Sequence, residues 1–163
     1  DGVGPMRIPN SNVLNCEHTW PQSKFTRSFP RDMQKSDLNH IFPTDSKANS
    51  MRGNYPFANV YGGPIANHCP ESFIGEPTEL FKRRSYFEPP QGHKGNVARA
   101  LFYFSVRYRM VISPTQEAHL RVWHEKDPVD AGEKRRNELV QEIQGNRNPF
   151  IDFPHLVGSI EDF

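Results

Sequence analysis

The fold is decided by three segments of the sequence, which read NCEHTWP at residues 15–21, SDLNHIFPTD at residues 36–45 and NSMRGN at residues 49–54. The first segment places a carboxylate, Glu17, directly beside an imidazole, His18. The third carries an amide, Asn49, and a guanidinium, Arg52, three positions apart and therefore on one face of a helix. We expect the remainder of the chain to hold these groups in place and to present a substrate to them.

This region predicts two short strands followed by a helix. Residues 12–20 alternate enough to form a strand, and residues 38–42 predict a second strand that Pro43 stops. The helix begins at Thr44, which suits an N-cap, and ends before Gly53, which suits the left-handed residue after a helix. The predicted order is therefore strand, polar connection, strand and helix.

Three helices are predicted in the second half of the chain. The clearest covers residues 94–110, because apolar residues recur there at the three- and four-residue spacing of a buried stripe. A second helix runs from about 115 to 124 behind Ser113 and Pro114, and a third from about 127 to 144. The apolar side expected for the third helix consists of Leu139, Val140 and Ile143.

Other segments read as irregular. Pro and Gly punctuate residues 54–92, which we expect to be mostly loop, with a short strand over residues 81–87. We expect residues 22–35 to form a polar, mobile connection and residues 146–163 to be extended or turning. With 15 Pro and 11 Gly among 163 residues, regular structure is predicted to be modest.

Composition favours one globular domain over a disordered or membrane-spanning chain. Hydrophobic residues make up only 35% and the mean hydropathy is −0.76, but 12 Phe supply large rings for a core. Charged residues, at 24%, do not predict disorder. No stretch approaches the roughly 20 apolar residues of a membrane span. The spacing of Cys16 and Cys69 fits no zinc motif, so they form one disulfide or remain two thiols.

The chemistry of the Glu-His and Asn-Arg pairs suits hydrolysis of a phosphodiester. A neutral imidazole takes a proton from water near pH 7. Carboxylate and amide oxygens are hard ligands that suit magnesium, calcium or manganese, and magnesium commonly takes only one or two protein ligands. An arginine can neutralise charge on a phosphoryl group. The net charge of +1 does not by itself indicate a nucleic-acid binder, because phosphate contacts need a basic face rather than a basic total.

The same motifs resemble the bacterial endonuclease I family of periplasmic or secreted nucleases. Further blocks at residues 87–103 and 144–152 agree, so the resemblance runs from about residue 12 to residue 156. It implies an α+β fold in which a ββα-metal (His-Me) finger is embedded in a helix- and loop-rich single domain. The expected organisation is an N-terminal loop, the finger and a helical and loop scaffold, at residues 1–11, 12–54 and 55–163.

The resemblance also implies roles for individual residues. His18 resembles the general base, while Glu17 and Asn49 resemble the metal ligands. The backbone oxygen of His40 or the side chain of Asn39 is expected to orient His18. The candidates for the arginine that supports the phosphate are Arg27, Arg31 and Arg52.

The implied function is a metal-dependent, largely sequence-nonspecific endonuclease. It would hydrolyse phosphodiester bonds of DNA, with RNA as a further plausible substrate, and leave 5′-phosphates. The expected cofactor is Mg²⁺, with Mn²⁺ or Ca²⁺ able to substitute. We expect a secreted or periplasmic monomer that acts on nucleic acid and not on a membrane.

Several alternatives remain open from the sequence. Arg52 either meets a phosphate or holds its helix to a carboxylate such as Asp37. Arg135, Arg136 and Arg147 are candidates for contact with nucleic acid, against a solvated or structural role. A different class of function is a nucleic-acid-binding or scaffolding protein that keeps the fold without catalysis, and a phosphatase acting on small substrates ranks last. The family usually has a longer segment before the Glu-His strand, so a piece is expected to be missing or processed away.

Overall fold

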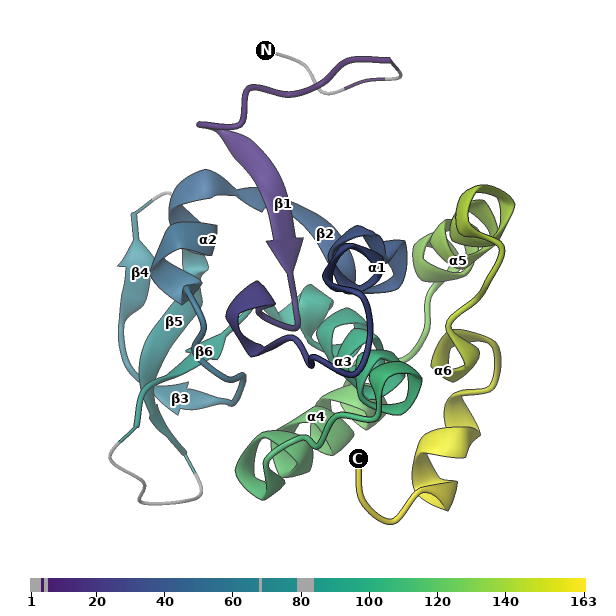
Figure 1. Cartoon of the computed structure of the whole chain (residues 1–163). Helices are drawn as coiled ribbons and strands as arrows, with labels where there is room; N and C mark the ends of the chain where they lie inside the picture. Colours follow the sequence, from purple (N-terminus) through teal and green to yellow (C-terminus); the bar gives the residue numbers. More distant parts are fainter. Residues whose placement is uncertain (1–3, 5, 68, 79–83) are drawn as a thin grey trace.

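The finger begins with two antiparallel strands, β1 (Leu14–His18) and β2 (Ile41–Asp45). Figure 1 shows both strands. The structure is a computed structural model, and it describes residues 4, 6–67, 69–78 and 84–163. Pro43 does not stop the second strand but lies inside it, opposite Cys16. A two-stranded sheet has only edge strands, so the N–H that proline lacks is not needed in the ladder. The segment expected to begin the strand is instead a 3-10 turn, η2 (Leu38–His40).

The connection between the two strands carries short helical segments and a buried side chain. It contains η1 (Gln22–Lys24) and α1 (Arg31–Ser36). The side chain of Gln34 is fully buried, and its amide donates to the carbonyl oxygens of Thr26 and Phe29 at 2.9 and 3.0 Å. One buried amide thus satisfies the carbonyls of the loop and holds it against the finger.

The finger ends with α2 (Ser46–Arg52). Its N-cap is Asp45 rather than Thr44, because the Asp45 carboxylate accepts from the backbone N–H groups of Lys47 and Ala48, both at 2.9 Å. Gly53 ends the helix with φ of +54°, as predicted. The expected ββα order is therefore confirmed, with a different capping residue.

A second sheet occupies the region expected to be mostly loop. It contains β3 (Val60–Tyr61), β4 (Pro64–Ala66), β5 (Cys69–Pro77) and β6 (Tyr86–Glu88), and β5 pairs antiparallel with the other three. A Cβ at Gly75 would overlap the carbonyl oxygen of Tyr61, so this Gly permits close pairing rather than a turn. The prediction of irregular structure was wrong there. The strand predicted over residues 81–87 falls partly on residues outside the described ranges.

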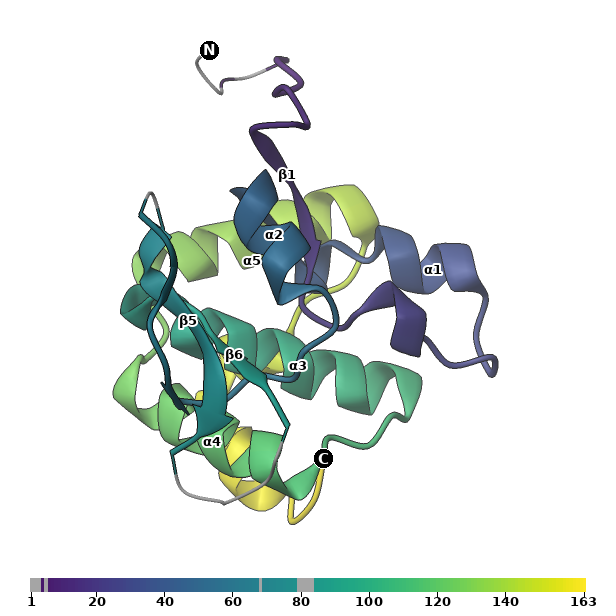
Figure 2. The ribbon, with the colours of Figure 1, turned by 90° about the vertical axis from the view of Figure 1, so that its left-hand side faces the viewer.

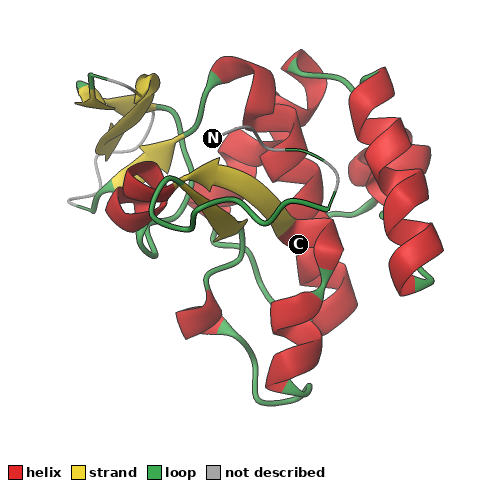
Figure 3. Cartoon of the chain, turned by 90° about the horizontal axis from the view of Figure 1, so that it is seen from above, coloured by secondary structure: helices red, strands yellow, loops and turns green. Residues whose placement is uncertain are grey.

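The core lies along α3 (Lys94–Tyr108), which runs through the middle of the molecule beneath the finger (Figures 1 and 2). Phe102 and Phe104 are completely buried. The helix ends two residues before the predicted end, because Arg109 adopts a left-handed conformation. Figure 3 shows the strands toward one side of the molecule and most helical segments toward the other. None of the described helices combines the length and apolar character needed to cross a membrane.

The remaining helices are α4 (Pro114–Lys126), α5 (Ala131–Gln144) and α6 (Pro149–Asp152), followed by η4 (Pro154–Ser159). The tail is therefore partly helical, which was not predicted. Of the apolar side expected for α5, Val140 is buried as predicted, but Ile143 is 75% exposed and Leu139 is 39% exposed. The other buried residues of this helix are polar, Glu133 and Asn137.

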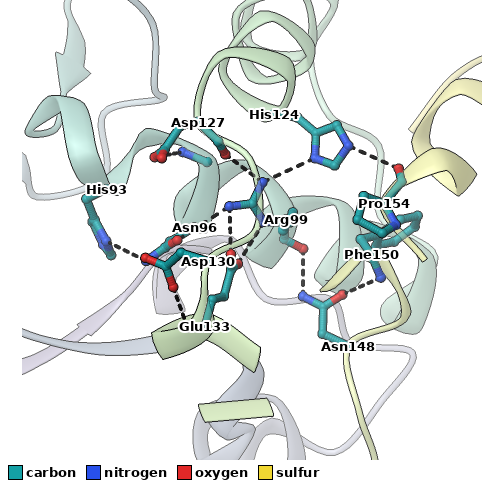
Figure 4. Close-up of polar contacts among 11 residues, drawn as sticks. His93, Asn96, Arg99, His124, Asp127, Asp130, Glu133, Asn148, Phe150 and Pro154 are labelled. Atoms are coloured by element: carbon teal, nitrogen blue, oxygen red, sulfur yellow. Dashed lines mark hydrogen bonds and ion pairs between the residues drawn. The ribbon is translucent and has the colours of Figure 1, made fainter. Parts of the chain in front are cut away.

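The polar face of α5 is buried because it meets Arg99 of α3, which is fully buried. Arg99 pairs with Glu133 at 2.7 Å and donates to the carbonyl oxygen of Asp127 at 2.9 Å (Figure 4). Asn148 donates to the carbonyl oxygen of Arg99 at 2.9 Å. This network fixes α5 and the segment before α6 onto the central helix.

Candidate active site

Glu17 and His18 reach one pocket because β1 ends at His18. Neighbouring residues on a regular strand point to opposite faces. Beyond His18 the chain turns away, and both the N–H and the hydroxyl of Thr19 donate to the carbonyl oxygen of His40 at 3.0 and 3.1 Å. Glu17 and His18 therefore both border a pocket of about 460 Å³. Asn49 and Arg52 border the same pocket, so the structure brings together the four groups that opened the sequence analysis.

The guanidinium of Arg52 is bonded internally. It pairs with Glu17 at 2.8 Å and donates to the carbonyl oxygens of His18 and Thr19 at 3.1 and 2.6 Å. Its side chain is 3% exposed, and the guanidinium lies 4.5 Å from the centre of the Phe57 ring. The carboxylate that holds Arg52 is thus Glu17 and not Asp37.

Glu17 is a carboxylate that needs a cation. Burial raises its pKa, and the charge of Arg52 opposes this shift. Burial disfavours the charged form of a carboxyl group, so a second positive charge beside Glu17 would be strongly favoured. A buried carboxylate that gains from a further positive charge is suited to bind a metal cation.

His18 is held by a main-chain carbonyl. Its Nε2 lies 2.9 Å from the carbonyl oxygen of Lys35. Because a carbonyl only accepts, Nε2 carries the proton and Nδ1 is the acceptor, 3.4 Å from the amide nitrogen of Gln22. Burial lowers the pKa of His18, although its hydrogen bond to Lys35 opposes the shift. The imidazole is therefore neutral near pH 7, as a general base must be.

The two predicted orienting contacts to His18 are not the ones that the structure shows. The carbonyl oxygen of His40 accepts from Thr19, and the side chain of Asn39 lies 3.5 Å from Asn146. The His40 ring packs edge-on against His18, with the ring centres 5.3 Å apart. Lys35 was missed because a backbone carbonyl leaves no signal in the sequence.

Asn49 presents its amide oxygen rather than its nitrogen. The nitrogen donates to the side-chain oxygen of Asn15 at 2.8 Å and to the carbonyl oxygen of Cys16 at 3.1 Å. These two bonds use both amide protons, which leaves Oδ1 to accept or to ligate. Together with Glu17 this makes a set of two hard oxygen donors, which fits a divalent cation that keeps most of its waters. Within the described ranges, no group of three or more His, Cys, Asp or Glu residues could hold a metal.

Arg27 and Arg31 lie outside this pocket but next to it. Both are exposed and border a neighbouring cavity of about 780 Å³. Arg31 donates to the carbonyl oxygen of Gln22 at 3.2 Å, and Gln22 is the residue that contacts His18. Both arginines therefore lie at the surface beside the pocket that Glu17 and His18 border.

The three arginines expected to bind nucleic acid differ in their surroundings. Arg136 donates to the carbonyl oxygens of Leu38 and Ile41, the latter at 2.7 Å, and so fixes β2 to α5. Arg147 pairs with Asp152 at 2.6 Å. Arg135 is largely exposed and, among the described residues, pairs only with Glu138 on the same helix.

The two cysteines are free thiols. Cys16 is exposed, opposite Pro43 in the finger, whereas Cys69 begins β5. Burial and the nearby carboxylate of Asp45 raise the pKa of Cys69. The choice that the sequence left open between a disulfide and two thiols is thereby settled.

Comparison with known sequences decides the family. The sequence profile of endonuclease I matches residues 2–155, which is nearly the whole chain. The chain belongs to the endonuclease I family. The ββα-metal finger expected for that family is therefore the β1–β2–α2 unit that carries Glu17, His18 and Asn49.

Several curated nucleases are similar to most of this chain. An extracellular ribonuclease of Bacillus amyloliquefaciens is 35% identical over 90% of this chain and 53% of its own length. An extracellular deoxyribonuclease of Aeromonas hydrophila is 28% identical over 85% of this chain and 58% of its own length. A periplasmic deoxyribonuclease of the same organism is 27% identical over 85% of this chain. The chain spans little more than half the length of these relatives.

Proposed function

We propose that this chain is a metal-dependent endonuclease that hydrolyses phosphodiester bonds of nucleic acid. The observation that carries the proposal is the convergence of Glu17, His18 and Asn49 on one pocket. An acceptor nitrogen on a neutral imidazole lies there beside two hard oxygen donors. This combination suits water attack on phosphorus.

In this mechanism His18 is the general base. Its Nδ1 accepts a proton from water, and the carbonyl oxygen of Lys35 holds the ring and stabilises the imidazolium that forms. The water oxygen bonds to phosphorus as the bond from phosphorus to the 3′ oxygen breaks, which leaves a 5′-phosphate. A divalent cation such as Mg²⁺, Mn²⁺ or Ca²⁺, held by Glu17 and Asn49, would supply charge stabilisation at the leaving oxygen.

Arginines outside the pocket complete the proposal. Arg31, linked to His18 through Gln22, and Arg27 at the same cavity are proposed to meet the phosphate or the backbone beside it. Arg52 is proposed to position Glu17, because its two terminal nitrogens already serve Glu17 and two carbonyls. Arg135 is the most accessible of the arginines proposed to contact nucleic acid from α5.

The proposed substrate class includes both DNA and RNA. Relatives bear the names ribonuclease and deoxyribonuclease, which supports a site that addresses the shared phosphate backbone rather than base edges. The names extracellular and periplasmic support an exported protein. Residues 12–54 are proposed to act as the catalytic finger and residues 55–163 as its scaffold, in a monomer.

The test is nicking of supercoiled plasmid in the presence of Mg²⁺. We expect nicking by the wild-type chain, none after EDTA treatment, and none by His18→Ala. The variant should keep the wild-type circular dichroism spectrum and bind single-stranded DNA with unchanged affinity. Nicking by His18→Ala at the wild-type rate would rule out this general base, and a wild-type chain that binds but never nicks would indicate a binding protein.

A further inference from the structure

A small cavity of about 140 Å³ adjoins the active-site pocket. The two share Pro21 and Arg52 in their walls. Two further cationic residues, Lys24 and Arg84, line the small cavity and come from segments far apart in the sequence. We call this space the Lys24–Arg84 cavity.

The charges of Lys24 and Arg84 are not neutralised within the described part of the chain. Lys24 donates to the carbonyl oxygen of Asn54 at 2.9 Å and forms no ion pair there. Arg84 is exposed and has no ion pair or hydrogen bond with any described residue. No Asp or Glu belongs to the described wall of the cavity. Burial lowers the pKa of Lys24, and the charges of Arg84 and Arg52 lower it further, as expected for cations gathered without an anion.

Two other features of the wall favour an anion. Arg52 belongs to it, and the Nε of this buried arginine has no hydrogen-bond partner among the described residues. An unsatisfied buried donor costs free energy unless a ligand or water supplies an acceptor. Helix α4 also begins at the cavity, where Ser113 and Gln116 line the wall and the Ser113 side chain makes no capping hydrogen bond.

The cavity has the size of one phosphoryl group. Its volume corresponds to a few waters at about 30 Å³ each, well below the roughly 300 Å³ of pockets that take drug-sized ligands. Its position relative to the active site is set by Lys24, since the carbonyl that Lys24 contacts belongs to Asn54, which lines the active-site pocket. An anion in the cavity would therefore lie next to the phosphodiester that is cut.

We propose that Lys24 and Arg84 form a second phosphate subsite, which binds a phosphate of the substrate strand next to the scissile one. This inference rests on the proposed nuclease function. With this subsite, an active site that contacts no nucleobase would still bind a nucleic-acid strand more tightly than a molecule with one phosphodiester. It requires only electrostatic attraction and hydrogen bonds from the two cations.

Dinucleotides with a single cleavable bond test the subsite. TpT has only the scissile phosphate, whereas pTpT and TpTp add one terminal phosphate on either side. We expect the wild-type chain to cleave one of the last two with a kcat/KM about five- to tenfold above that of TpT. The double variant Lys24→Gln, Arg84→Gln should lose this gain while it cleaves TpT as the wild type does.

The matched control is Lys126→Gln, which removes an exposed cation from the other end of α4. Twelve helical steps place it about 18 Å from the start of that helix. It should keep the full gain. Equal kcat/KM for the three dinucleotides in the wild type, or a gain that survives the double variant, would overturn the proposal.

A binding measurement separates failure of the subsite from failure of the nuclease function. In EDTA, the slope of log K against log salt for a single-stranded oligonucleotide should become shallower by about 0.7 in the double variant. A changed slope without any cleavage by the wild type would refute the nuclease function and keep the subsite. Two results together would overturn the proposal and assign the cavity to free phosphate. Inorganic phosphate would shift the side-chain NMR signals of Lys24 and Arg84, and the salt slope of oligonucleotide binding would be the same in the double variant as in the wild type.

Discussion

Arg52 and Glu17 form an ion pair of 2.8 Å where α2 meets the end of β1. The same guanidinium donates to the carbonyl oxygens of His18 and Thr19. The Arg52 side chain of α2 thus sets the position of the Glu17 carboxylate and of the main chain at His18 and Thr19. This arrangement explains how two neighbouring strand residues can serve one pocket, and it leads to the first prediction.

Arg52→Met should lower the free energy of unfolding by about 3–5 kcal/mol, because it leaves Glu17 buried without its partner. The side chains of the pair are only 3% and 13% exposed. Urea denaturation followed by circular dichroism measures the change. The control is Arg135→Met, whose pair with Glu138 is more than half exposed and contributes less than about 1 kcal/mol. If Arg52→Met lowered the free energy of unfolding no more than Arg135→Met does, the pair with Glu17 would not stabilise the fold.

The pH dependence of cleavage should report His18. Its pKa is lowered from 6.5 by burial, so the neutral, proton-accepting form persists to lower pH than in an unperturbed histidine. We expect kcat/KM to rise with pH, with a midpoint below 6.5, and to level off above it. His18→Gln should lower kcat/KM by at least about 10²-fold. A midpoint above 6.5 would mean that the ring is not desolvated as the structure has it.

Asn15 should affect the affinity for the metal without touching it. Its side-chain oxygen accepts from the amide of Asn49 and so turns the Asn49 oxygen away from itself. Loss of such an outer contact typically weakens metal affinity by about 10- to 100-fold, which we expect for Asn15→Leu. The measurement is the Mg²⁺ concentration at half-maximal nicking. Ser50→Ala, on the exposed side of the same helix, is the control and should leave this value unchanged.

Arg147 should be a structural residue with a small effect on stability. Its hydrogen bonds lower the pKa of Asp152 below 3.8, so the pair stabilises the fold above that pH and the benefit disappears as the pH falls through the lowered pKa. Because both side chains are partly exposed, Arg147→Gln should cost less than about 1 kcal/mol near pH 7. The salt dependence of DNA binding should not change. A slope shallower by about 0.7 would instead make Arg147 a phosphate contact.

The two thiols should differ in their reactivity. A thiol reagent near pH 8 should modify two cysteines per chain without prior reduction. Cys16 should react first, because it is exposed, and Cys69 later, because burial and Asp45 raise its pKa and lower its thiolate fraction. Rates measured separately in Cys16→Ser and Cys69→Ser test the order. Fewer than two reactive thiols in the unfolded chain would indicate a disulfide.

The sequence by itself determined the strand, strand, helix order of the finger and the residue types that this unit brings together. Local signals suffice for this order, because a strand that stops before Pro21 and a helix that ends at Gly53 depend on residues close together in the chain. They did not fix the bounds of the second strand or the capping residue, which are 41–45 and Asp45. The periodic stripe of α3 was equally visible. The identities of Glu17, His18 and Asn49 also follow from the sequence, since their types and order carry the resemblance to the endonuclease I family.

Only the tertiary structure decided what holds these residues. The sheet around β5 depends on the pairing of short segments rich in Pro and Gly, whose register no local pattern shows. The partner of His18 is a main-chain oxygen, which every residue carries, so Lys35 has no distinguishing signal. From the sequence alone, Arg52 could face a phosphate or a carboxylate such as Asp37. The structure pairs it with Glu17, because that buried carboxylate requires a nearby cation.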